Sequence, residues 1–185
     1  ITLLFQSNGG GFNGAGYLYT VETNGTNAQL VYNHGFTADG TNPSQGLIKD
    51  ASNNLYGVLY QGGAGGAGVV YKHASDGSGS VVLHHFLGNQ ARNPIGRLLL
   101  ASDGMLYGVC ANGSNNANLY RGGAIYRLNT DGSGFQIIKE FNTGTSTICS
   151  PAGGFAEGSG GELYGITNDA YASTGSASIY RINKD

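Results

Sequence analysis

The sequence predicts an all-β fold, a small β-propeller of about four blades in which the first and last blades are incomplete. Two observations lead to this prediction. Short apolar runs alternate with turns rich in glycine, asparagine and aspartate, which is the pattern of antiparallel hairpins. The same four-strand pattern recurs every 50 to 57 residues, which is typical of propeller blades. No segment shows the i, i+3, i+4 recurrence of an amphipathic helix.

The clearest copy of the pattern runs from Pro43 to Phe86. Its expected strands contain residues 46–48, 55–57, 69–71 and 82–83, and glycine-rich or Asx turns separate them. In a propeller the first strand of each blade lines the central channel and the fourth lies at the rim. The unbroken apolar run at residues 98–100 fits an inner strand, because a strand that is packed on both faces reads as continuously apolar.

Two landmarks count the copies. Prolines precede the tyrosine of a Leu-Tyr-Gly sequence by 13 residues in three copies, and a second tyrosine marks the third strand of all four. The first pairs are Pro43 and Tyr56, Pro94 and Tyr107, and Pro151 and Tyr164, and the third-strand tyrosines are Tyr19, Tyr71, Tyr126 and Tyr180. The expected blades span residues 1–36, 43–86, 94–141 and 151–185 as one domain.

The two end blades each lack one strand in this alignment. Residues 3–5 of the first copy match the second strand of the unit, so its first strand is missing, and the fourth copy stops before its fourth strand. A ring of four blades of about 54 residues needs about 216 residues, and the chain has 185. Unpaired strand edges invite strand addition from another chain.

Composition excludes several function classes. Charged residues make up 11% and the net charge is −2, so no field attracts nucleic acid or an anionic membrane. No apolar run approaches the roughly 18 residues of a membrane span. The chain has no initiator Met and no signal-peptide pattern, so we expect a mature secreted product or a trimmed fragment. Low charge with abundant small polar residues favours an extracellular location.

The repeat resembles a known group of sequences. The pattern Pro-x-x-Gly-Leu, Leu-Tyr-Gly, Gly-Gly, Gly-x-Val-Tyr and Asp-Gly-Ser-Gly is similar to the GloVer-type tandem repeats of bacterial extracellular, surface-anchored proteins. The resemblance covers nearly the whole chain and implies a propeller-like fold without catalytic residues. The first copy departs from the pattern, because residues 3–5 read Leu-Leu-Phe where Leu-Tyr-Gly is expected.

Candidate sites for cofactors and metals are weak. The stretch from Gly63 to Gly68 matches G-x-G-x-x-G, but a strand follows it, whereas a dinucleotide site needs a helix N-terminus. The Asp-Gly-Ser-Gly turns at Asp76 and Asp131 lack the spaced acids of a calcium loop, so at most an incidental calcium ion is expected there. The adjacent residues His84 and His85 point to opposite faces of a strand and cannot share one metal. We therefore expect no cofactor.

The recurring tyrosines favour packing between blades, with each hydroxyl group reaching a partner. Three tyrosines fall outside the repeat, in expected loops, and are the candidates for glycan or assembly contacts: Tyr60, Tyr120 and Tyr171. The two cysteines, Cys110 and Cys149, lie where an up-and-down topology brings them to one face of the propeller. An intrachain disulfide is one expectation, an intermolecular bridge its main rival, and free buried thiols the third.

The expected function is that of a non-enzymatic extracellular structural protein, a propeller subunit that assembles with copies of itself into a filament, tube or sheath. The alternative is a glycan-binding or adhesive module at the cell surface. An enzyme acting on polysaccharide is the third reading, and the scattered carboxylates nominate no particular acid for it.

Overall fold

A computed structural model describes residues 2–10, 14–35, 39–76, 78–113, 122–141, 151–167 and 177–184. Every named element in these ranges is a β-strand, which confirms the all-β prediction. In the same ranges, no helix with the length and apolar character of a membrane span occurs.

The strands form four antiparallel sheets, one for each predicted blade. The first contains β1 (Thr2–Ser7), β2 (Tyr17–Glu22) and β3 (Gln29–Asn33). The second contains β4 (Thr41–Pro43), β5 (Ile48–Lys49), β6 (Leu55–Gln61), β7 (Val69–His73) and β8 (Val81–His85). The third contains β9 (Arg92–Leu100), β10 (Met105–Asn112), β11 (Ala124–Asn129) and β12 (Gln136–Glu140). The fourth contains β13 (Pro151–Glu157), β14 (Leu163–Thr167) and β15 (Ser178–Ile182).

Within the described residues, the first and last sheets contain three strands each. Phe5 of β1 pairs with Tyr19 as Gly57 of β6 pairs with Tyr71, so β1 is a second strand. The last sheet has the order β13-β14-β15, which corresponds to the first three strands of the complete sheet β9 to β12. In the second blade the first strand is divided into β4 and β5, and both pieces pair with β6.

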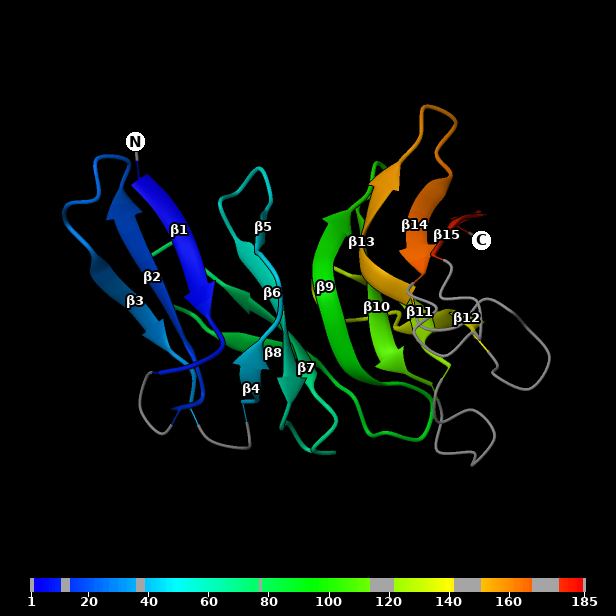
Figure 1. The fold of residues 1–185 in the computed structure, drawn as a ribbon, viewed down its shortest axis with the longest axis horizontal. Coiled ribbons are helices and arrows are strands. Elements are labelled where there is room, and N and C mark those ends of the chain that lie inside the picture. The colour runs from blue at the N-terminus through cyan, green and yellow to red at the C-terminus, as the bar shows by residue number, and fades with distance from the viewer. Residues whose placement is uncertain are drawn as a thin grey trace.

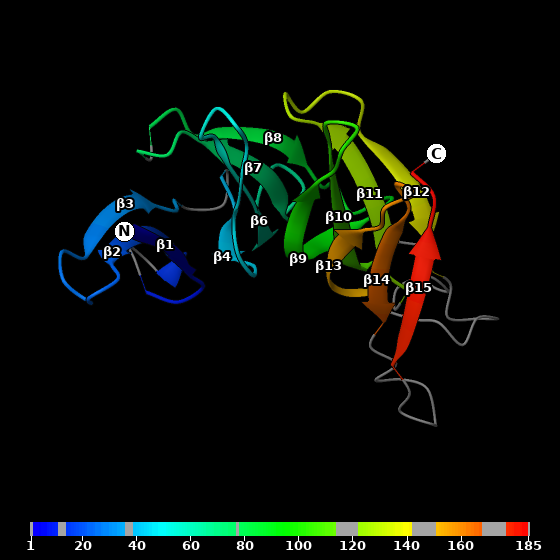
Figure 2. The same ribbon diagram turned by 90° about the horizontal axis from the view of Figure 1, so that it is seen from above.

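The blades lie side by side in an arc. Figure 2 shows β4, β9 and β13 toward the concave side and β8 and β12 toward the convex side, as expected for inner and rim strands. The first and fourth blades lie at opposite ends of the molecule, so the ring is open between them (Figure 1). The described residues therefore form a propeller arc with two end faces.

A glycine under each third-strand tyrosine explains the Leu-Tyr-Gly sequence. A Cβ on Gly57 would lie 2.5 Å from the Tyr71 hydroxyl oxygen, and Gly108 and Gly165 are overlain in the same way by Tyr126 and Tyr180. The tyrosine ring thus lies across the backbone of the neighbouring strand. In the first blade Phe5 occupies this position, and its ring stacks on Tyr19 with a centroid distance of 5.5 Å. The departure of residues 3–5 from the repeat therefore changes one aromatic contact and keeps the strand pairing.

Glycine and proline form a joint between successive blades. The glycine three residues before each third-strand tyrosine touches the proline of the next blade, and a Cβ there would overlap the proline ring. The pairs are Gly16 and Pro43, Gly68 and Pro94, and Gly123 and Pro151. The position in the last blade is Ala177, which is exposed. The fixed proline of the repeat is thus a docking residue for the preceding blade.

Each joint also carries a ring from the preceding rim strand. The residue that follows this strand packs against the third-strand tyrosine of the next blade. The pairs are His34 and Tyr71 at 5.3 Å, Phe86 and Tyr126 at 5.1 Å, and Phe141 and Tyr180 at 5.6 Å between ring centroids. The same three residues also donate their backbone N–H groups to the carbonyl oxygens of the joint glycines, at distances of 2.9 to 3.0 Å. These hydrogen bonds join His34 to Gly16, Phe86 to Gly68, and Phe141 to Gly123. One architecture therefore repeats at all three joints.

The apolar core is distributed unevenly over the joints. One cluster, which includes Val58, Val70, Phe86, Tyr126 and Leu128, connects the second and third blades. Two further clusters connect the third and fourth blades. None of the clusters formed by the described residues contains a residue of the first blade. The first blade is therefore held mainly by polar and aromatic contacts.

Candidate functional site

The Leu-Tyr-Gly tyrosines act in structure, as their periodicity predicts. Each hydroxyl group donates to an acid in the turn that precedes its strand. The pairs are Tyr56 to Asp50 at 2.9 Å, Tyr107 to Asp103 at 2.7 Å, and Tyr164 to Glu162 at 2.8 Å. Burial, and then the hydrogen bond to the acid, raise the pKa of both Tyr56 and Tyr107 to about 12. These carboxylates hold tyrosines and are not poised for catalysis.

The third-strand tyrosines differ in their hydroxyl partners. The Tyr71 hydroxyl donates to Gln6 Oε1 of the preceding blade at 2.7 Å. The Tyr126 hydroxyl is buried and makes no hydrogen bond to a described residue. The position equivalent to Gln6 is Val58 in the second blade, and Val58 packs in the same cluster as Tyr126. The expectation that every tyrosine hydroxyl finds a partner is wrong at Tyr126, because the neighbouring blade offers a valine there.

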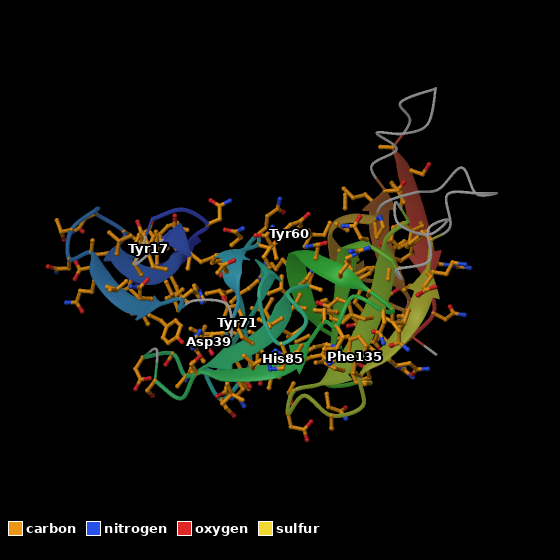
Figure 3. All side chains as sticks on the ribbon, turned by 90° about the horizontal axis from the view of Figure 1, so that it is seen from below. Tyr17, Asp39, Tyr60, Tyr71, His85 and Phe135 are labelled. Carbon is orange, nitrogen blue, oxygen red and sulfur yellow. The ribbon has the colours of Figure 1, made fainter. Side chains whose placement is uncertain are left out.

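Of the three tyrosines proposed for glycan or assembly contacts, only Tyr60 is described, and Tyr120 and Tyr171 lie outside the described residues. Tyr60 does not lie in a loop, because β6 continues to Gln61 through the pairing of Gln61 with Thr41. Figure 3 shows its side chain toward the concave side of the arc. Its backbone carbonyl accepts a hydrogen bond from Asn93 Nδ2 at 3.0 Å, and Asn93 Oδ1 accepts one from Asn112 Nδ2 at 3.0 Å.

Cys110 is a free thiol and is completely buried. It lies inside β10, opposite Pro94 and Ala124. Burial raises the pKa of this thiol well above its usual value, so it is a poor nucleophile and a poor metal ligand. Cys149 lies outside the described residues, so the Cys110–Cys149 disulfide stays a prediction.

The glycine-rich and Asx segments are turns. Residues 62–68 connect β6 to β7, so a strand follows the G-x-G-x-x-G sequence as predicted. A Cβ on Gly65 would lie 2.5 Å from the Leu87 Cα atom, so packing requires a glycine there. In the Asx turns Asp76 Oδ1 accepts the backbone N–H of Ser78 at 2.9 Å, and Asp131 Oδ1 accepts that of Ser133 at 2.8 Å.

The adjacent histidines serve two different contacts. The His84 ring stacks on Phe135 with a centroid distance of 3.6 Å, and His85 Nδ1 accepts the backbone N–H of Ala64 at 3.1 Å. Both rings are half-buried. Within the described ranges, no three or more His, Cys, Asp or Glu residues are grouped in a way that could hold a metal ion.

A polar cluster that sequence reasoning missed joins the third and fourth blades. Lys184 Nζ forms an ion pair with Glu157 and lies 3.0 Å from Ser102 Oγ. Ser102 also donates its backbone N–H to Glu157 Oε2 at 2.8 Å and its hydroxyl group to Glu157 Oε1. Asp103 Oδ2 lies 4.0 Å from Lys184 Nζ. Ser102 is 55 positions from Glu157 and 82 from Lys184, and Glu157 and Lys184 are 27 apart. No spacing in the sequence signals their contact.

This cluster is arranged as a clasp and not as a catalytic centre. Activation of a serine nucleophile requires an unprotonated base beside it that can take up the hydroxyl proton. The hydrogen bonds from Lys184 and then Ser102 lower the pKa of Glu157 to about 2, which makes its carboxylate a weak base. Lys184 is engaged in the ion pair as a cation. The cluster therefore ties the β9–β10 turn to both ends of the last blade.

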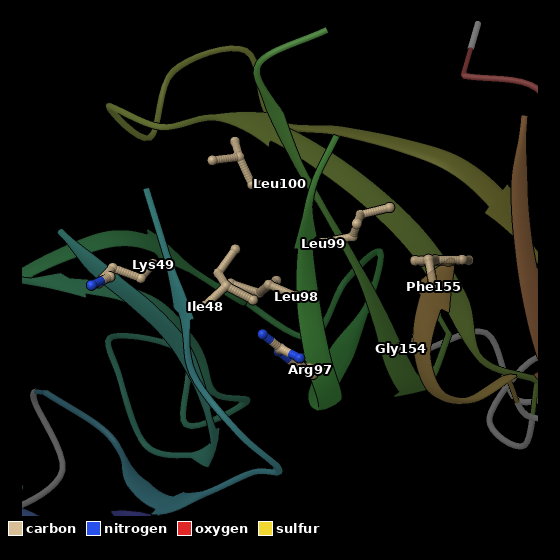
Figure 4. Close-up of a pocket in the computed structure, with 8 residues that line it drawn as sticks. All are labelled: Ile48, Lys49, Arg97, Leu98, Leu99, Leu100, Gly154 and Phe155. Atoms are coloured by element: carbon tan, nitrogen blue, oxygen red, sulfur yellow. The ribbon is translucent and has the colours of Figure 1, made fainter. Parts of the chain in front are cut away.

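A pocket of about 510 Å³ lies along the inner strands β5, β9 and β13 (Figure 4). Its lining is mostly aliphatic, and its charged members are Lys49 and Arg97. In Figure 4 Arg97 lies on β9 opposite Ile48 of β5. No acid, histidine, serine or cysteine is among the described residues that line it. Of the groups used in acid–base or nucleophilic chemistry, this described lining offers only the Lys49 amine.

The most unusual surface is the end face of the last blade. Ile166 is 52% exposed and Ile179 is 79% exposed, whereas the equivalent residues of the third blade, Val109 and Ile125, are 1% and 0% exposed. In the third blade these positions pack against Phe155, Tyr180 and Ile182 of the next blade. The end face thus presents the same apolar residues that make a joint elsewhere, without a blade upon them. We call the face formed by Ile166 and Ile179 the back face.

The opposite end of the arc carries the complementary positions. Tyr19 and Val21 of β2 occupy the places of Tyr180 and Ile182, and both are half-buried. On the same blade Leu3 and Phe5 of β1 are each 41% exposed, whereas Leu55 and Leu106, which match Leu3, are 3% and 0% exposed. We call the face formed by Tyr19, Val21 and the edge of β1 the front face. The arc therefore has one unmatched back face and one unmatched front face.

Solved structures with a similar fold are β-propeller proteins. One is the crystal structure of a nidogen/laminin complex, with 15% identity and a TM-score of 0.61 over 90% of this chain and 51% of that chain. The others are a candidate gluconolactonase (14%, TM-score 0.57, 90% and 52%) and a candidate TolB from Agrobacterium tumefaciens (12%, TM-score 0.56, 93% and 54%). The chain spans about half the length of these chains, and at such identities the likeness shows the fold alone.

No curated protein matches the sequence. The profile of the Gloeobacter/Verrucomicrobia repeat matches residues 2–184. This match extends over all four blades, in agreement with the repeated Pro, Leu-Tyr-Gly and third-strand tyrosine positions. The chain therefore belongs to the Gloeobacter/Verrucomicrobia repeat family, and its repeats are the blades of a β-propeller-like arc.

Proposed function

We propose that this chain is a non-enzymatic, extracellular structural protein that assembles with copies of itself into a filament, tube or sheath. The observation that carries the proposal is the pair of unmatched end faces. The back face exposes Ile179 to 79%, at a position that is fully buried in the blade before it. A second copy is the occupant that offers the front face in the matching geometry.

The intrachain joints serve as templates for the contact between copies. At the joint between the third and fourth blades, Val109 and Ile125 pack on Tyr180 and Ile182. Tyr180 is the third-strand tyrosine of the next blade, and Ile182 lies two positions beyond it. A second copy would place Tyr19 and Val21 on Ile166 and Ile179 in the same relation. This contact joins two different surfaces, so it propagates unless the rotation closes a ring. The open form of such an assembly is a helical filament.

The residue at position 177 fits this arrangement. At the three intrachain joints a glycine is required, because the proline of the next blade occupies the space of a Cβ. The corresponding residue of the last blade is Ala177. The described first blade has no proline strand in front of β1. A front face without the proline accepts Ala177, whereas a blade that docks through proline would meet its methyl group.

The edges of β1 and β15 support the same contact. Within the described residues β1 pairs only with β2, and β15 pairs only with β14. Backbone N–H and C=O groups on the free sides of these strands are available for pairing with another chain. A charged fraction of 11% and a net charge of −2 keep repulsion between copies low.

The test compares two exposed apolar residues. Ile179→Lys places a charge on the back face, and Leu87→Lys places one in the loop after β8, where Leu87 is 61% exposed. Neither change should disturb folding, because both side chains are largely in solvent. Electron microscopy and light scattering at neutral pH should show polymers for the wild type and for Leu87→Lys and discrete monomers for Ile179→Lys. Wild-type monomers over a wide concentration range would refute the proposal.

A glycan-binding or adhesive module is the second proposal. It is supported by the Tyr60 side chain, which Figure 3 shows toward the concave side, and by the amide pair of Asn93 and Asn112, in which Asn93 donates to the Tyr60 backbone carbonyl. Sugar sites combine aromatic rings with amide groups. Binding on a glycan panel that is lost on Tyr60→Ala, and kept on Ile179→Lys, would favour this function over assembly.

A further inference from the structure

The joint between the first and second blades differs chemically from the other two. At the joint of the second and third blades, Phe86 from the rim side meets Tyr126 and Leu128, and at the last joint Phe141 meets Tyr180 and Ile182. The two positions that hold Phe and Leu or Ile in these joints hold His34 and His73 in the first joint. Two imidazoles thus replace two apolar side chains at one joint.

Both histidines are buried. His34 and His73 are each 1% exposed, and their ring centroids lie 6.0 Å apart. Tyr71 packs against both rings, at 5.3 Å from His34 and 4.8 Å from His73, and Tyr32 lies 4.3 Å from His73. The pair is therefore enclosed by aromatic rings from β3 of the first blade and β7 of the second.

The surroundings give a positive charge little support. His34 Nε2 and both ring nitrogens of His73 make no hydrogen bond to a described residue. The titratable groups that face the pair are Tyr32 and Tyr71, and Gln6, which accepts the Tyr71 hydroxyl, is neutral. In the loop that follows His34, the Asp39 carboxylate lies 3.2 Å from the place of a Cβ on Gly35. Residues 36–38 of that loop carry no ionisable side chain.

We propose that the joint between the first and second blades is an acid-sensitive switch, in which protonation of His34 and His73 releases the first blade from the arc. When both histidines are neutral, they pack at this joint as Phe86 and Leu128 pack at the next one. A doubly protonated pair would place two like charges 6.0 Å apart between rings, without an acceptor at three of its nitrogens. No apolar cluster connects the first blade to the second. Besides the ring contacts, the joint has the Gly16–Pro43 docking and hydrogen bonds that include those from Tyr71 to Gln6 and from Asn42 N–H to Ala15 O.

The direction of the pH effect follows from the lowered pKa values of the two histidines. Burial lowers the pKa of His34 to about 4, with the second imidazole contributing, and burial alone lowers that of His73 to about 4. The histidines of a released blade titrate near 6.5, so the joint is stable above this pH and is lost as the pH falls toward 4. Between pH 6.5 and pH 4, each histidine raises the equilibrium constant for release of the blade about tenfold per pH unit. Because this rise begins only near pH 6.5, the pair together raises the constant about 500-fold between pH 7 and pH 5.

Hydrogen exchange resolved by peptide tests the switch. In the wild type, protection of β1 to β3, corrected for intrinsic exchange, should fall by about two to three orders of magnitude from pH 7 to pH 5, while β9 to β12 keep theirs. The variant with His34→Phe and His73→Leu, which copies the neighbouring joint, should lose this pH dependence. Either single substitution should reduce the effect to about 20-fold, which keeps the test decisive if the double variant folds poorly.

His84→Phe is the matched control. Burial lowers the pKa of His84 to about 4 as well, but its ring packs on Phe135 between the second and third blades. This variant should keep the acid-induced loss of protection in the first blade. Unchanged protection of β1 to β3 at pH 5 would overturn the proposal. So would a uniform loss over all blades, or a pH dependence that persists in the double variant.

Discussion

Replacement of Gly68 by alanine should open the joint between the second and third blades. A Cβ at this position would lie 2.5 Å from the Leu59 carbonyl oxygen and 3.0 Å from Pro94 Cγ, and it would overlap Pro94 Cδ. Carbon atoms in contact are normally about 3.5 to 4.0 Å apart, so either the third blade or the strand β6 has to shift.

Two contributions make up the expected loss of stability. The φ of Gly68 is +104°, and a left-handed conformation costs a residue with a Cβ about 1 to 3 kcal/mol. Overpacking against the proline and the carbonyl group adds about 1 to 3 kcal/mol. We therefore expect Gly68→Ala to lower the free energy of unfolding by about 2 to 6 kcal/mol.

Gly66→Ala in the same loop separates the two contributions. Gly66 also has a positive φ, +68°, but a Cβ there would meet nothing within 4 Å. Its expected loss is therefore only the backbone contribution of about 1 to 3 kcal/mol. For a chain of this size 1 kcal/mol corresponds to about 2 to 4 °C in Tm. Gly68→Ala should thus melt several degrees below Gly66→Ala.

Thermal unfolding followed by circular dichroism measures the difference, and hydrogen exchange locates it. Two backbone bonds at the joint should weaken in Gly68→Ala and not in Gly66→Ala. Asn93 N–H to Ala67 O, at 2.7 Å, links the third blade to the second, and Phe86 N–H to Gly68 O, at 3.0 Å, holds the joint glycine within the second blade. Equal melting temperatures of the two variants would refute the account of the glycine–proline joint.

Three further predictions concern single side chains. Tyr126→Phe removes a buried hydroxyl group without a described partner and should be neutral or stabilising by up to about 1 kcal/mol, whereas Tyr71→Phe leaves Gln6 without its donor and should destabilise by about 1 kcal/mol in urea unfolding. Glu157 has a pKa of about 2, below its unfolded value, so its contribution is present above pH 4.5 and is lost as the pH falls toward 2. Glu157→Gln should therefore flatten that part of the stability profile, and an unchanged profile would contradict the clasp. Cys110, whose pKa is raised by burial, should resist alkylation until the protein unfolds, and mass mapping of unreduced peptides tests the predicted bond to Cys149.

The repeat was predictable because it follows from local rules. Glycine and Asx turns delimit the strands, and a fixed inner spacing indicates a rigid unit. The sequence also predicts which strand of the unit residues 3–5 form, and the pairing of Phe5 with Tyr19 confirms their assignment to a second strand. It also predicts the structural role of Tyr56, Tyr107 and Tyr164, since a residue that recurs once per blade serves the blade.

Contacts between blades were not predictable in the same way. Ser102, Glu157 and Lys184 meet only because three chain segments converge at one corner, and no local pattern encodes that meeting. The histidine joint does carry a sequence signal. His34, Phe86 and Phe141 each follow a third-strand tyrosine by 15 residues, so alignment on the tyrosines shows a histidine where the other blades have phenylalanine. The meaning of that difference required the structure, which places His73 beside it.

The position of Tyr60 was predicted wrongly, because the end of a strand is hard to predict from sequence. The glycines from Gly62 onward suggested that the loop begins early, but pairing of Thr41 with Gln61 extends β6 past Tyr60. The partner strand β4 decides where β6 ends, and β4 has only three residues with little apolar signal. A short partner strand of this kind is recognised only once the sheet is assembled.

The most direct test of assembly through the end faces is hydrogen exchange at low and high protein concentration, with the intact gene product as the sample. The account predicts that protection rises with concentration in β1 and β15, the strands at the two end faces, and stays constant in the rim strand β8. Ile179→Lys should abolish the rise, and Leu87→Lys should not. Protection of β1 and β15 that is independent of concentration would contradict assembly between copies.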